Sequence, residues 1–155
     1  MTDTADNTLI LDTTKGKVSI AMRPDLAPGH VARIKALVRE GFYDGIVFHR
    51  VIDGFMAQTG CPQGTGTGGS GKKLKAEFNS EPHRRGTVSM ARSSDPDSGD
   101  SQFFICFDDA SFLNGKYTVW GQVTEGMDNV DKIKRGEPVQ NPDKILTARM
   151  AADAG

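Results

Sequence analysis

The string FHRVIDGFMAQTG, residues 48–60, places an arginine among apolar side chains, where a charged group could do chemistry. An Asp-Gly pair inside the string suits a two-residue hairpin turn, so the apolar runs on either side predict two short antiparallel strands. Arg50 alternates with Phe48 and Ile52, and on the period of two of a strand it shares their face. A guanidinium stays charged in proteins, and burying a charge among apolar groups is costly. Its presence there is therefore explained either by ion-pair partners or by a functional role. We interpret Arg50 as a candidate functional residue, with a structural ion pair as the alternative.

A second set of residues could build a groove around this arginine. In the run QFFICF, Phe103 and Phe104 point to opposite faces of one strand, so one faces the core and the other a second packed layer or a groove. Gln58 and Gln102 are the polar companions of Arg50 that could line such a groove. An aromatic floor with a few convergent hydrogen-bonding groups is typical of a peptide or small-ligand site.

Two glycine-rich strings approach nucleotide-binding motifs without the structural context of those motifs. Residues 64–69, GTGTGG, match G-x-G-x-x-G, but no βαβ strand precedes them and the following KKLKAEFN is a poor amphipathic helix. Residues 66–73 approach a phosphate-binding loop, but Lys73 stands where a Ser or Thr hydroxyl would ligate magnesium. We therefore interpret this segment as a surface loop.

The histidines and cysteines do not predict a metal site. His30, His49 and His83 are scattered without metal-ligand spacing, and Cys61 and Cys106 form neither a ligand pair nor a disulfide framework. Cys106 lies in an apolar run and is expected to be buried, whereas Cys61 lies in a loop and is expected to be the more reactive thiol. The sequence contains no G-x-S-x-G elbow. It therefore predicts no metal, no cofactor and no hydrolase chemistry.

Composition and charge indicate one soluble domain. The 155 residues carry 19 Lys and Arg against 20 Asp and Glu, and the net charge of -1 gives no reason to expect nucleic acid or an anionic membrane as a partner. No apolar run approaches the length of a membrane span, and the polar start is unlike a signal peptide. We expect a single domain over residues 1–155, with 1–7 as a polar extension, in the cytoplasm with reduced thiols.

The elements that must position these residues are predicted as about eight strands and two helices. One helix is expected over 27–41, with Pro28 in its first turn and Gly41 as its stop, and a shorter one over 127–134. Strands are expected in the runs 8–14, 17–22, 46–58 (a hairpin), 86–91, 102–107, 117–123 and 144–151, with a long functional loop over 59–85. Strands follow one another instead of alternating with helices, which favours an antiparallel barrel or sandwich capped by two helices.

Four strings in the chain closely resemble the cyclophilin-type peptidyl-prolyl cis-trans isomerases. They occur in order and at the expected separations: FHRVIDGFMAQ, SMAR (89–92), SQFFI (101–105) and FLNGKYTVWGQV (112–123). The resemblance extends from about Leu9 to Met150, and the glycine-rich loop fits it too. It implies a mainly β fold, a closed eight-stranded antiparallel β-barrel capped by two α-helices, and a bacterial, single-domain member. We expect the protein to be a monomer in solution.

The resemblance also implies a role for each candidate site residue. Arg50 is expected to project into a groove on the outer face of the barrel as the catalytic residue. The proline ring of the substrate is expected to bind in an apolar pocket of Phe55, Met56, Phe104 and Leu113, with the peptide backbone held by Gln58, Gln102, Ala91 and Arg92.

Three positions depart from the best-known eukaryotic pattern of the family. Phe112 stands where many members have Trp, Tyr117 where they have His, and Arg92 where Asn is common. An aromatic exchange keeps the pocket wall, so we expect Phe112 and Tyr117 to contribute to substrate binding; simple core packing is the alternative for Phe112. Because a phenylalanine lacks the indole N–H, we expect only weak binding of cyclosporin-type ligands.

The activity that the resemblance implies is acceleration of rotation about X-Pro peptide bonds in folding or exposed polypeptide segments. No cofactor, metal or covalent intermediate is expected, and the expected partners are proline-containing peptides and unfolded or flexible protein segments. The first alternative is a binding module or chaperone that grips proline-containing segments with little turnover. The second is a structural subunit of a larger assembly, for which the sequence offers no appended domain, coiled coil or basic tail.

Overall fold

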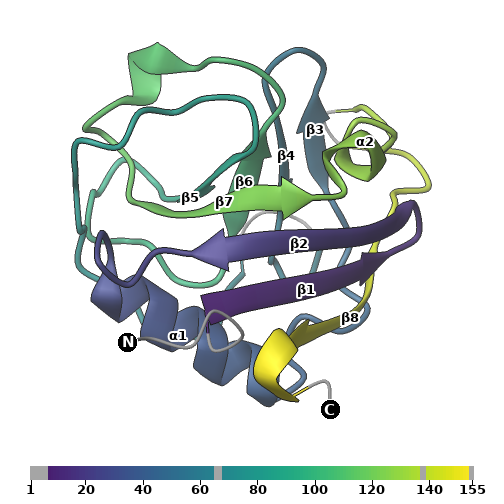
Figure 1. The fold of residues 1–155 in the computed structure, drawn as a ribbon, viewed down its shortest axis with the longest axis horizontal. Helices are drawn as coiled ribbons and strands as arrows, with labels where there is room; N and C mark the ends of the chain where they lie inside the picture. The colour runs from purple at the N-terminus through teal and green to yellow at the C-terminus, as the bar shows by residue number, and fades with distance from the viewer. Residues whose placement is uncertain (1–6, 65–67, 137–138, 154–155) are drawn as a thin grey trace.

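The computed structural model describes residues 7–64, 68–136 and 139–153, so the extension expected at 1–7 lies outside the described part except for Asn7. Within these ranges the chain forms eight strands and two α-helices, as the sequence predicts (Figure 1). The elements are β1 (Thr8–Thr13), β2 (Gly16–Met22), α1 (Pro28–Arg39), β3 (Arg50–Ile52), β4 (Met56–Thr59), β5 (Thr87–Met90), β6 (Phe103–Cys106), the 3-10 helix η2 (Ser111–Leu113), β7 (Val119–Glu125), α2 (Met127–Val130), β8 (Ile145–Met150) and the 3-10 helix η3 (Ala151–Asp153).

All eight strands belong to one antiparallel sheet that curls around a core (Figure 1). The strand order is β3-β4-β6-β5-β7-β2-β1-β8. The hairpins β1–β2 and β3–β4 form as predicted, while β4 pairs with β6 rather than with β5. The predicted two-residue turn at Asp53 and Gly54 is wrong, because Ile52 pairs with Met56 and the loop has three residues, 53–55, with a positive φ at Gly54 only. This order brings β4, β5 and β6 side by side, and these three strands support the site described below.

The sheet does not close into a complete barrel, so the expected closure is overstated. Its edge strands β3 and β8 do not pair with each other. The gap between them is spanned by the chain that precedes β8, through the isolated bridges Val47↔Lys144 and Val51↔Gly136. Pro142 lies in this connecting segment, and a residue without an N–H interrupts a strand ladder. The sheet is therefore a half-barrel, and a loop segment covers the gap between its two edge strands.

The main core lies between the inner face of the sheet and α1. Trp120, Tyr43, Phe48 and Phe103 are among its largest fully buried side chains. Helix α1 has Pro28 at its start and buries the apolar stripe that includes Val31, Ile34, Leu37 and Val38. Its C-terminal stop is Gly41, whose φ of 76° is the left-handed conformation that glycine adopts without a Cβ clash.

The second helix is much shorter than predicted. α2 ends at Val130, whereas the sequence pattern predicts a helix as far as Lys134. Beyond Val130 the backbone N–H of Ile133 donates to the carbonyl of Val130 in a tight turn, and the N–H of Lys134 donates to a carboxylate oxygen of Asp143 at 2.8 Å. A partner distant in the sequence therefore replaces the next helical hydrogen bond.

The long segment expected to be a functional loop is fastened to the rest of the fold at several places, and two of them tie it to α1 and to β7. The first is the start of α1, where Ala27 provides no side-chain cap. The carboxylate of Glu77 accepts hydrogen bonds there from the N–H groups of Gly29 (3.1 Å) and His30 (2.8 Å), and it lies 2.6 Å from Nδ1 of His30. An anion at a helix N-terminus satisfies unpaired N–H groups and interacts favourably with the helix dipole.

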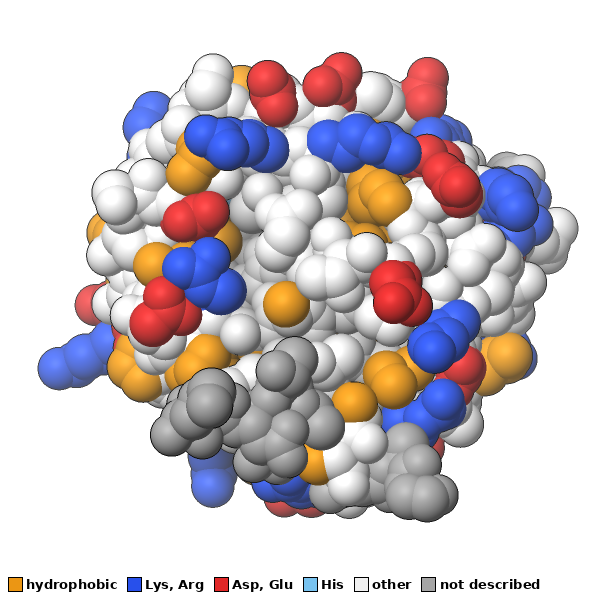
Figure 2. All heavy atoms as spheres, in the orientation of Figure 1, with side chains coloured by type: hydrophobic (Ala, Val, Ile, Leu, Met, Phe, Trp, Pro, Cys, Tyr) orange, Lys and Arg blue, Asp and Glu red, His pale blue; other side chains and the backbone are white. Residues whose placement is uncertain are grey.

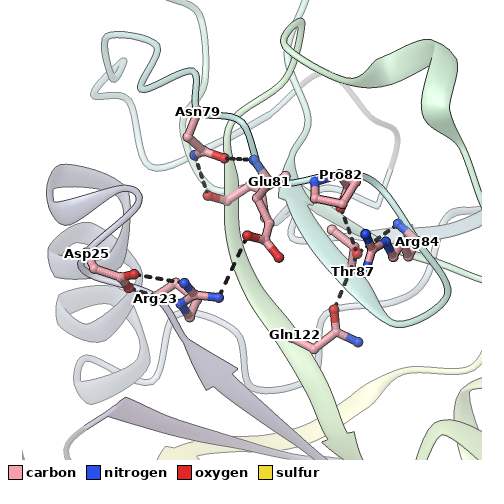
Figure 3. A network of polar contacts seen from close by, with 9 residues as sticks. Arg23, Asp25, Asn79, Glu81, Pro82, Arg84, Thr87 and Gln122 are labelled. Atoms are coloured by element: carbon pink, nitrogen blue, oxygen red, sulfur yellow. Dashed lines mark hydrogen bonds and ion pairs between the residues drawn. The ribbon is translucent and has the colours of Figure 1, made fainter.

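The second attachment is a polar network between this segment and β7 (Figure 3). The side chain of Asn79 donates to the carbonyl of Val119 at 3.2 Å and accepts from the N–H of Glu81 at 3.1 Å. Glu81 lies 4.0 Å from the guanidinium of Arg23, and Thr87 hydrogen-bonds the side chain of Gln122 (Figure 3). These contacts hold the chain that leads into β5.

The surface has no dominant charge on the face shown in Figure 2, where Lys and Arg side chains alternate with Asp and Glu. This agrees with the nearly balanced count of charged residues. None of the helices in the described ranges has the length and apolarity that a membrane span needs.

Candidate functional site

The outer face of β4 and β6 carries a second apolar layer. Side chains alternate along these strands, so Phe103 joins the main core while Phe104 joins the outer layer, as the sequence predicts for the pair. The buried members of this outer layer are Met56, Phe104, Cys106, Ala110 and Leu113, and Ile52, Phe55, Ala91 and Tyr117 pack against it partly buried.

A pocket of about 120 Å³ opens on this outer layer. The structure brings all the candidate site residues to its walls except Gln102 and Phe112. The lining residues are Arg50, Phe55, Met56, Gln58, Ala91, Arg92, Phe104, Leu113 and Tyr117. An apolar floor with polar groups on one side is therefore present, and it is assembled from β3, β4, β6 and the segments after β5 and β6.

Arg50 stands at the polar side of this pocket within a chain of side-chain hydrogen bonds. It pairs with Gln58 across the β3–β4 hairpin, and its Nη1 donates to Oε1 of Gln58 at 3.4 Å. Nε2 of Gln58 then donates to Oε1 of Gln102 at 2.9 Å, and Nε2 of Gln102 donates to the carbonyl of Gly68 at 2.9 Å. The amides are thus oriented by one another, and their orientation presents an oxygen to the guanidinium.

The face assigned to Arg50 from the sequence is only half right. Arg50 and Ile52 do share the outer face of β3, with Ile52 packed against the outer layer. Phe48, however, belongs to the main core. The strand begins at Arg50, so the period of two does not extend back to Phe48.

Phe112 lies beside the pocket and not in the core. Its side chain is 62% exposed, so the alternative of simple core packing is wrong. Its ring centroid is 5.5 Å from that of Phe55, which lines the pocket. The 3-10 helix η2 explains this position, because it points Leu113 inward while leaving Phe112 on the rim.

Tyr117 and Arg92, two of the departures from the common family pattern, form one unit. The guanidinium carbon of Arg92 lies 4.6 Å from the ring centroid of Tyr117, and Arg92 donates two hydrogen bonds to the carbonyl of Lys116, at 2.8 and 3.0 Å. The ring of Tyr117 in turn meets Phe104 edge-on with centroids 5.7 Å apart. The unit closes one wall of the pocket.

The family model for cyclophilin-type peptidyl-prolyl cis-trans isomerases matches residues 8–150. The chain belongs to this family. A probable peptidyl-prolyl cis-trans isomerase of Brucella suis is 56% identical over 165 aligned positions, which cover 96% of this chain and 84% of the relative. The peptidyl-prolyl cis-trans isomerase B of Bacillus subtilis is 46% identical over 123 positions, 78% of this chain and 85% of that protein.

Solved cyclophilin structures share the fold. A cyclophilin from Hirschia baltica superposes with a TM-score of 0.89 at 35% identity, covering 96% of this chain and 75% of that one. A cyclophilin-type isomerase of Cryptosporidium parvum, crystallised in the presence of the dipeptide Ala-Pro, superposes with a TM-score of 0.86 at 27% identity, over 92% of this chain and 98% of that one. The family and the isomerase activity implied by the sequence motifs are therefore confirmed: this cyclophilin is a peptidyl-prolyl cis-trans isomerase.

One residue that packs behind the pocket of this cyclophilin was missed by the sequence reasoning. His83, considered there only as a metal ligand, is buried, and its ring stacks on Phe104 with centroids 6.1 Å apart. Its Nδ1 lies 3.1 Å from Oδ1 of Asn114 and its Nε2 lies 3.0 Å from Oγ of Ser89. Burial lowers the pKa of His83, and the hydrogen bond to Asn114 opposes that shift. A single histidine in an irregular segment carries no sequence signal for this position.

The two cysteines of this cyclophilin are both buried thiols outside any disulfide. Cys106 is buried in the outer layer as expected, and burial raises its pKa to about 12. Cys61 lies outside the strands, as expected, but it is buried too, and its greater reactivity stays a prediction. The N–H of Gly68 donates to its sulfur at 3.3 Å, and the thiol donates to Oε1 of Gln63 at 3.6 Å. Within the described part of the chain, no three or more His, Cys, Asp or Glu side chains form a group that could hold a metal ion.

Proposed function

We propose that this cyclophilin isomerises X-Pro bonds in the pocket on its outer layer, with Arg50 as the catalytic residue. The observation that carries the proposal is the position of Arg50 at the edge of an apolar pocket, next to the amide chain of Gln58 and Gln102. A proline ring would pack among Phe55, Met56, Phe104 and Leu113, all of which line this pocket. The backbone on either side of the proline would bind Gln58, Gln102, Ala91 and Arg92, with Tyr117 and Phe112 on the wall and rim.

The chemistry of the reaction suits such a site. Rotation about an amide must overcome a barrier of ~18–20 kcal/mol, because resonance gives the C–N bond double-bond character. An uncatalysed X-Pro bond therefore isomerises in tens to hundreds of seconds. In the twisted transition state the prolyl nitrogen regains a localised lone pair. A guanidinium that donates a hydrogen bond to that nitrogen stabilises the twisted state over the planar one.

The rate enhancement would come partly from Arg50 and partly from the pocket that holds the proline. A rate gain of ~10⁵ requires ~7 kcal/mol of differential stabilisation. One charge-assisted donor aimed at a developing lone pair contributes ~2.7–4 kcal/mol, by comparison with oxyanion-hole donors. The remainder would come from holding the proline ring while the preceding carbonyl turns, which requires no nucleophile and no general base.

The proposed substrates are proline-containing peptides and unfolded or flexible protein segments. The Cryptosporidium parvum relative crystallised in the presence of Ala-Pro supports this class of ligand. Because the pocket would contact mainly one proline ring and the adjacent backbone, it should accept many different client proteins. We further propose that the protein acts as a monomer in the cytoplasm, where its two buried thiols stay reduced. Sizing in solution tests the monomer.

The experiment that tests the proposal is cis/trans exchange of an Ala-Pro-Phe peptide, measured by NMR with the wild type and Arg50→Ala. We expect the variant to lose about 10²–10³ in kcat/KM, because the donor is lost mainly in the transition state. Arg39→Ala, at the exposed C-terminal turn of α1, is the matched control and should keep wild-type exchange. Unchanged exchange in Arg50→Ala would refute the role of Arg50. Proline-dependent binding without accelerated exchange by the wild type would instead favour the binding-module alternative.

A further inference from the structure

A second hollow of about 360 Å³ lies beside the proline pocket. The two share three wall residues, namely Gln58, Ala91 and Arg92. Its other lining residues are polar or small: Gly68, Gly69, Lys73, Ser93, Ser98, Asp100 and Gln102. The proline pocket is therefore continuous with a polar surface that differs from it in character.

The only acidic residue in this lining is already used by the protein. One carboxylate oxygen of Asp100 accepts hydrogen bonds from the N–H of Ser70 at 2.9 Å and from the hydroxyl of Ser70. The other accepts from the N–H of Gly71 at 3.0 Å. Asp100 thus holds the turn at 69–71 in place through neutral donors, and its charge leaves the hollow with two cations, Arg92 and Lys73, against one anion.

The basic residue on the shared wall is held differently. The guanidinium of Arg92 donates to the backbone carbonyls of Lys116, Ser93 and Ser94 and stacks on Tyr117. Its four hydrogen bonds use at most four of its five N–H groups. Among the described residues no carboxylate forms an ion pair with Arg92, so carbonyl oxygens orient its charge without neutralising it. Lys73 adds a second, exposed positive charge to the hollow.

We propose that Arg92 and Lys73 make this cyclophilin prefer clients with an aspartate or glutamate within three residues of the proline. This specificity rests on the proposed function, because it requires the proline to bind in the pocket that Arg92 helps to line. An extended chain advances about 3.3–3.6 Å per residue, so a side chain one to three residues away reaches the adjacent hollow. A client carboxylate would accept a hydrogen bond from the unused N–H of Arg92, and the positive charge of Lys73 would attract it.

The expected effect is moderate, because both cations contact solvent. An exposed ion pair changes binding by about threefold to fivefold, and salt screens it. The client carboxylate would be bound equally well whether the X-Pro bond is planar or twisted. The acidic residue should therefore lower KM and leave kcat nearly constant.

The test uses a set of neutral Ala-Pro-Phe peptides in which one flanking position at a time carries Glu or Gln, at up to three residues on either side of the proline. Exchange is measured by NMR at low and at high salt. We expect at least one position at which Glu lowers KM about threefold to fivefold relative to Gln, with the difference disappearing at high salt. If Glu and Gln are equal at every position while the neutral peptides turn over normally, the charge preference is wrong and the proposed function stands. If the neutral peptides do not turn over, the proposed function itself fails.

Variants assign the preference to the two cations. Lys73→Gln should reduce the Glu-to-Gln ratio and leave the turnover of the neutral peptide unchanged, whereas Lys75→Gln, an exposed residue outside the lining, should change neither. Arg92→Gln should remove most of the Glu-to-Gln ratio, with Lys73 keeping the remainder, and Arg92→Lys should retain more of it because the positive charge is kept. A merely structural role of Arg92 would lower the turnover of the Glu and Gln peptides equally, and that result would overturn the proposal.

Discussion

Phe103 and Phe104 are consecutive residues of β6 that lie in different layers of the molecule. Phe103 meets Tyr43 and Trp120 edge-on in the main core, with ring centroids 5.6 and 5.3 Å apart. Phe104 contacts His83 and Tyr117 on the outer layer and lines the pocket. One strand therefore supports the fold with its inner face and the site with its outer face. A substitution on one face should act mainly on stability, and a substitution on the other mainly on activity.

The largest expected effect separates these two faces directly. Phe103→Ala should lower the free energy of unfolding by about 3–5 kcal/mol, because it leaves a cavity in a closely packed core. Phe104→Ala should cost less stability, since its ring borders a pocket, but it should lower kcat/KM by about tenfold or more through loss of the apolar floor. Urea unfolding and peptide exchange on both variants measure the two quantities. Equal losses of stability and of activity at the two positions would break the comparison.

A second prediction concerns the access of water to the outer layer, where Cys106 is buried. Burial raises the pKa of Cys106 from 9.0 to about 12, which lowers the thiolate fraction about a thousandfold near neutral pH. In a Cys61→Ser variant, where Cys106 is the single thiol, labelling by a disulfide reagent should therefore be more than about tenfold slower in the folded protein than in urea, because burial both keeps the thiol protonated and shields it. Rapid labelling of the folded protein would show that water enters this layer.

A third prediction concerns the histidine behind the pocket. Because burial lowers the pKa of His83 in the folded protein, the unfolded chain binds more protons below about pH 6.5, and stability falls as the pH falls through that range. Urea unfolding at pH 7 and pH 5 should show a smaller loss for His83→Gln than for the wild type, by at most about 1.4 kcal/mol per pH unit. Burial also lowers the pKa of His30 and of His49, but both are present in the two proteins, so the difference isolates His83. Equal losses would contradict the prediction.

The smallest expected effect lies at the rim. Phe112→Trp should leave the free energy of unfolding within about 0.5 kcal/mol of the wild type, because the side chain is mostly exposed. The new indole N–H should raise the affinity for cyclosporin by up to about tenfold, the value of one hydrogen bond. Calorimetric titration of both proteins checks this. Sub-micromolar binding by the wild type would refute the expectation of weak binding.

The parts of the fold that the sequence predicts well are those with local causes. Alternating apolar residues predict the strands, and Pro28 with Gly41 delimits α1 to within two residues. The parts that it misses depend on partners far along the chain. The carboxylate of Asp143 ends the second helical segment early, and a connecting segment spans the gap between β3 and β8 in place of strand pairing.

The same distinction holds for the site. The motifs of the family contain every residue that lines the proline pocket, so the resemblance predicts the membership of the site. The chain of amides from Arg50 through Gln58 to Gln102 requires the register of β3, β4 and β6, and the position of His83 requires the fold of an irregular segment. Neither is visible in local sequence patterns.

Trp120 has an optical consequence. It is the single tryptophan of the chain, it is fully buried, and it packs against Phe103 on the inner layer. Its ring is absent from the walls of both the proline pocket and the neighbouring hollow. Its fluorescence therefore reports the integrity of the core and is insensitive to direct contact with a bound peptide. The protein thus carries an intrinsic probe of folding that is separate from its binding surface.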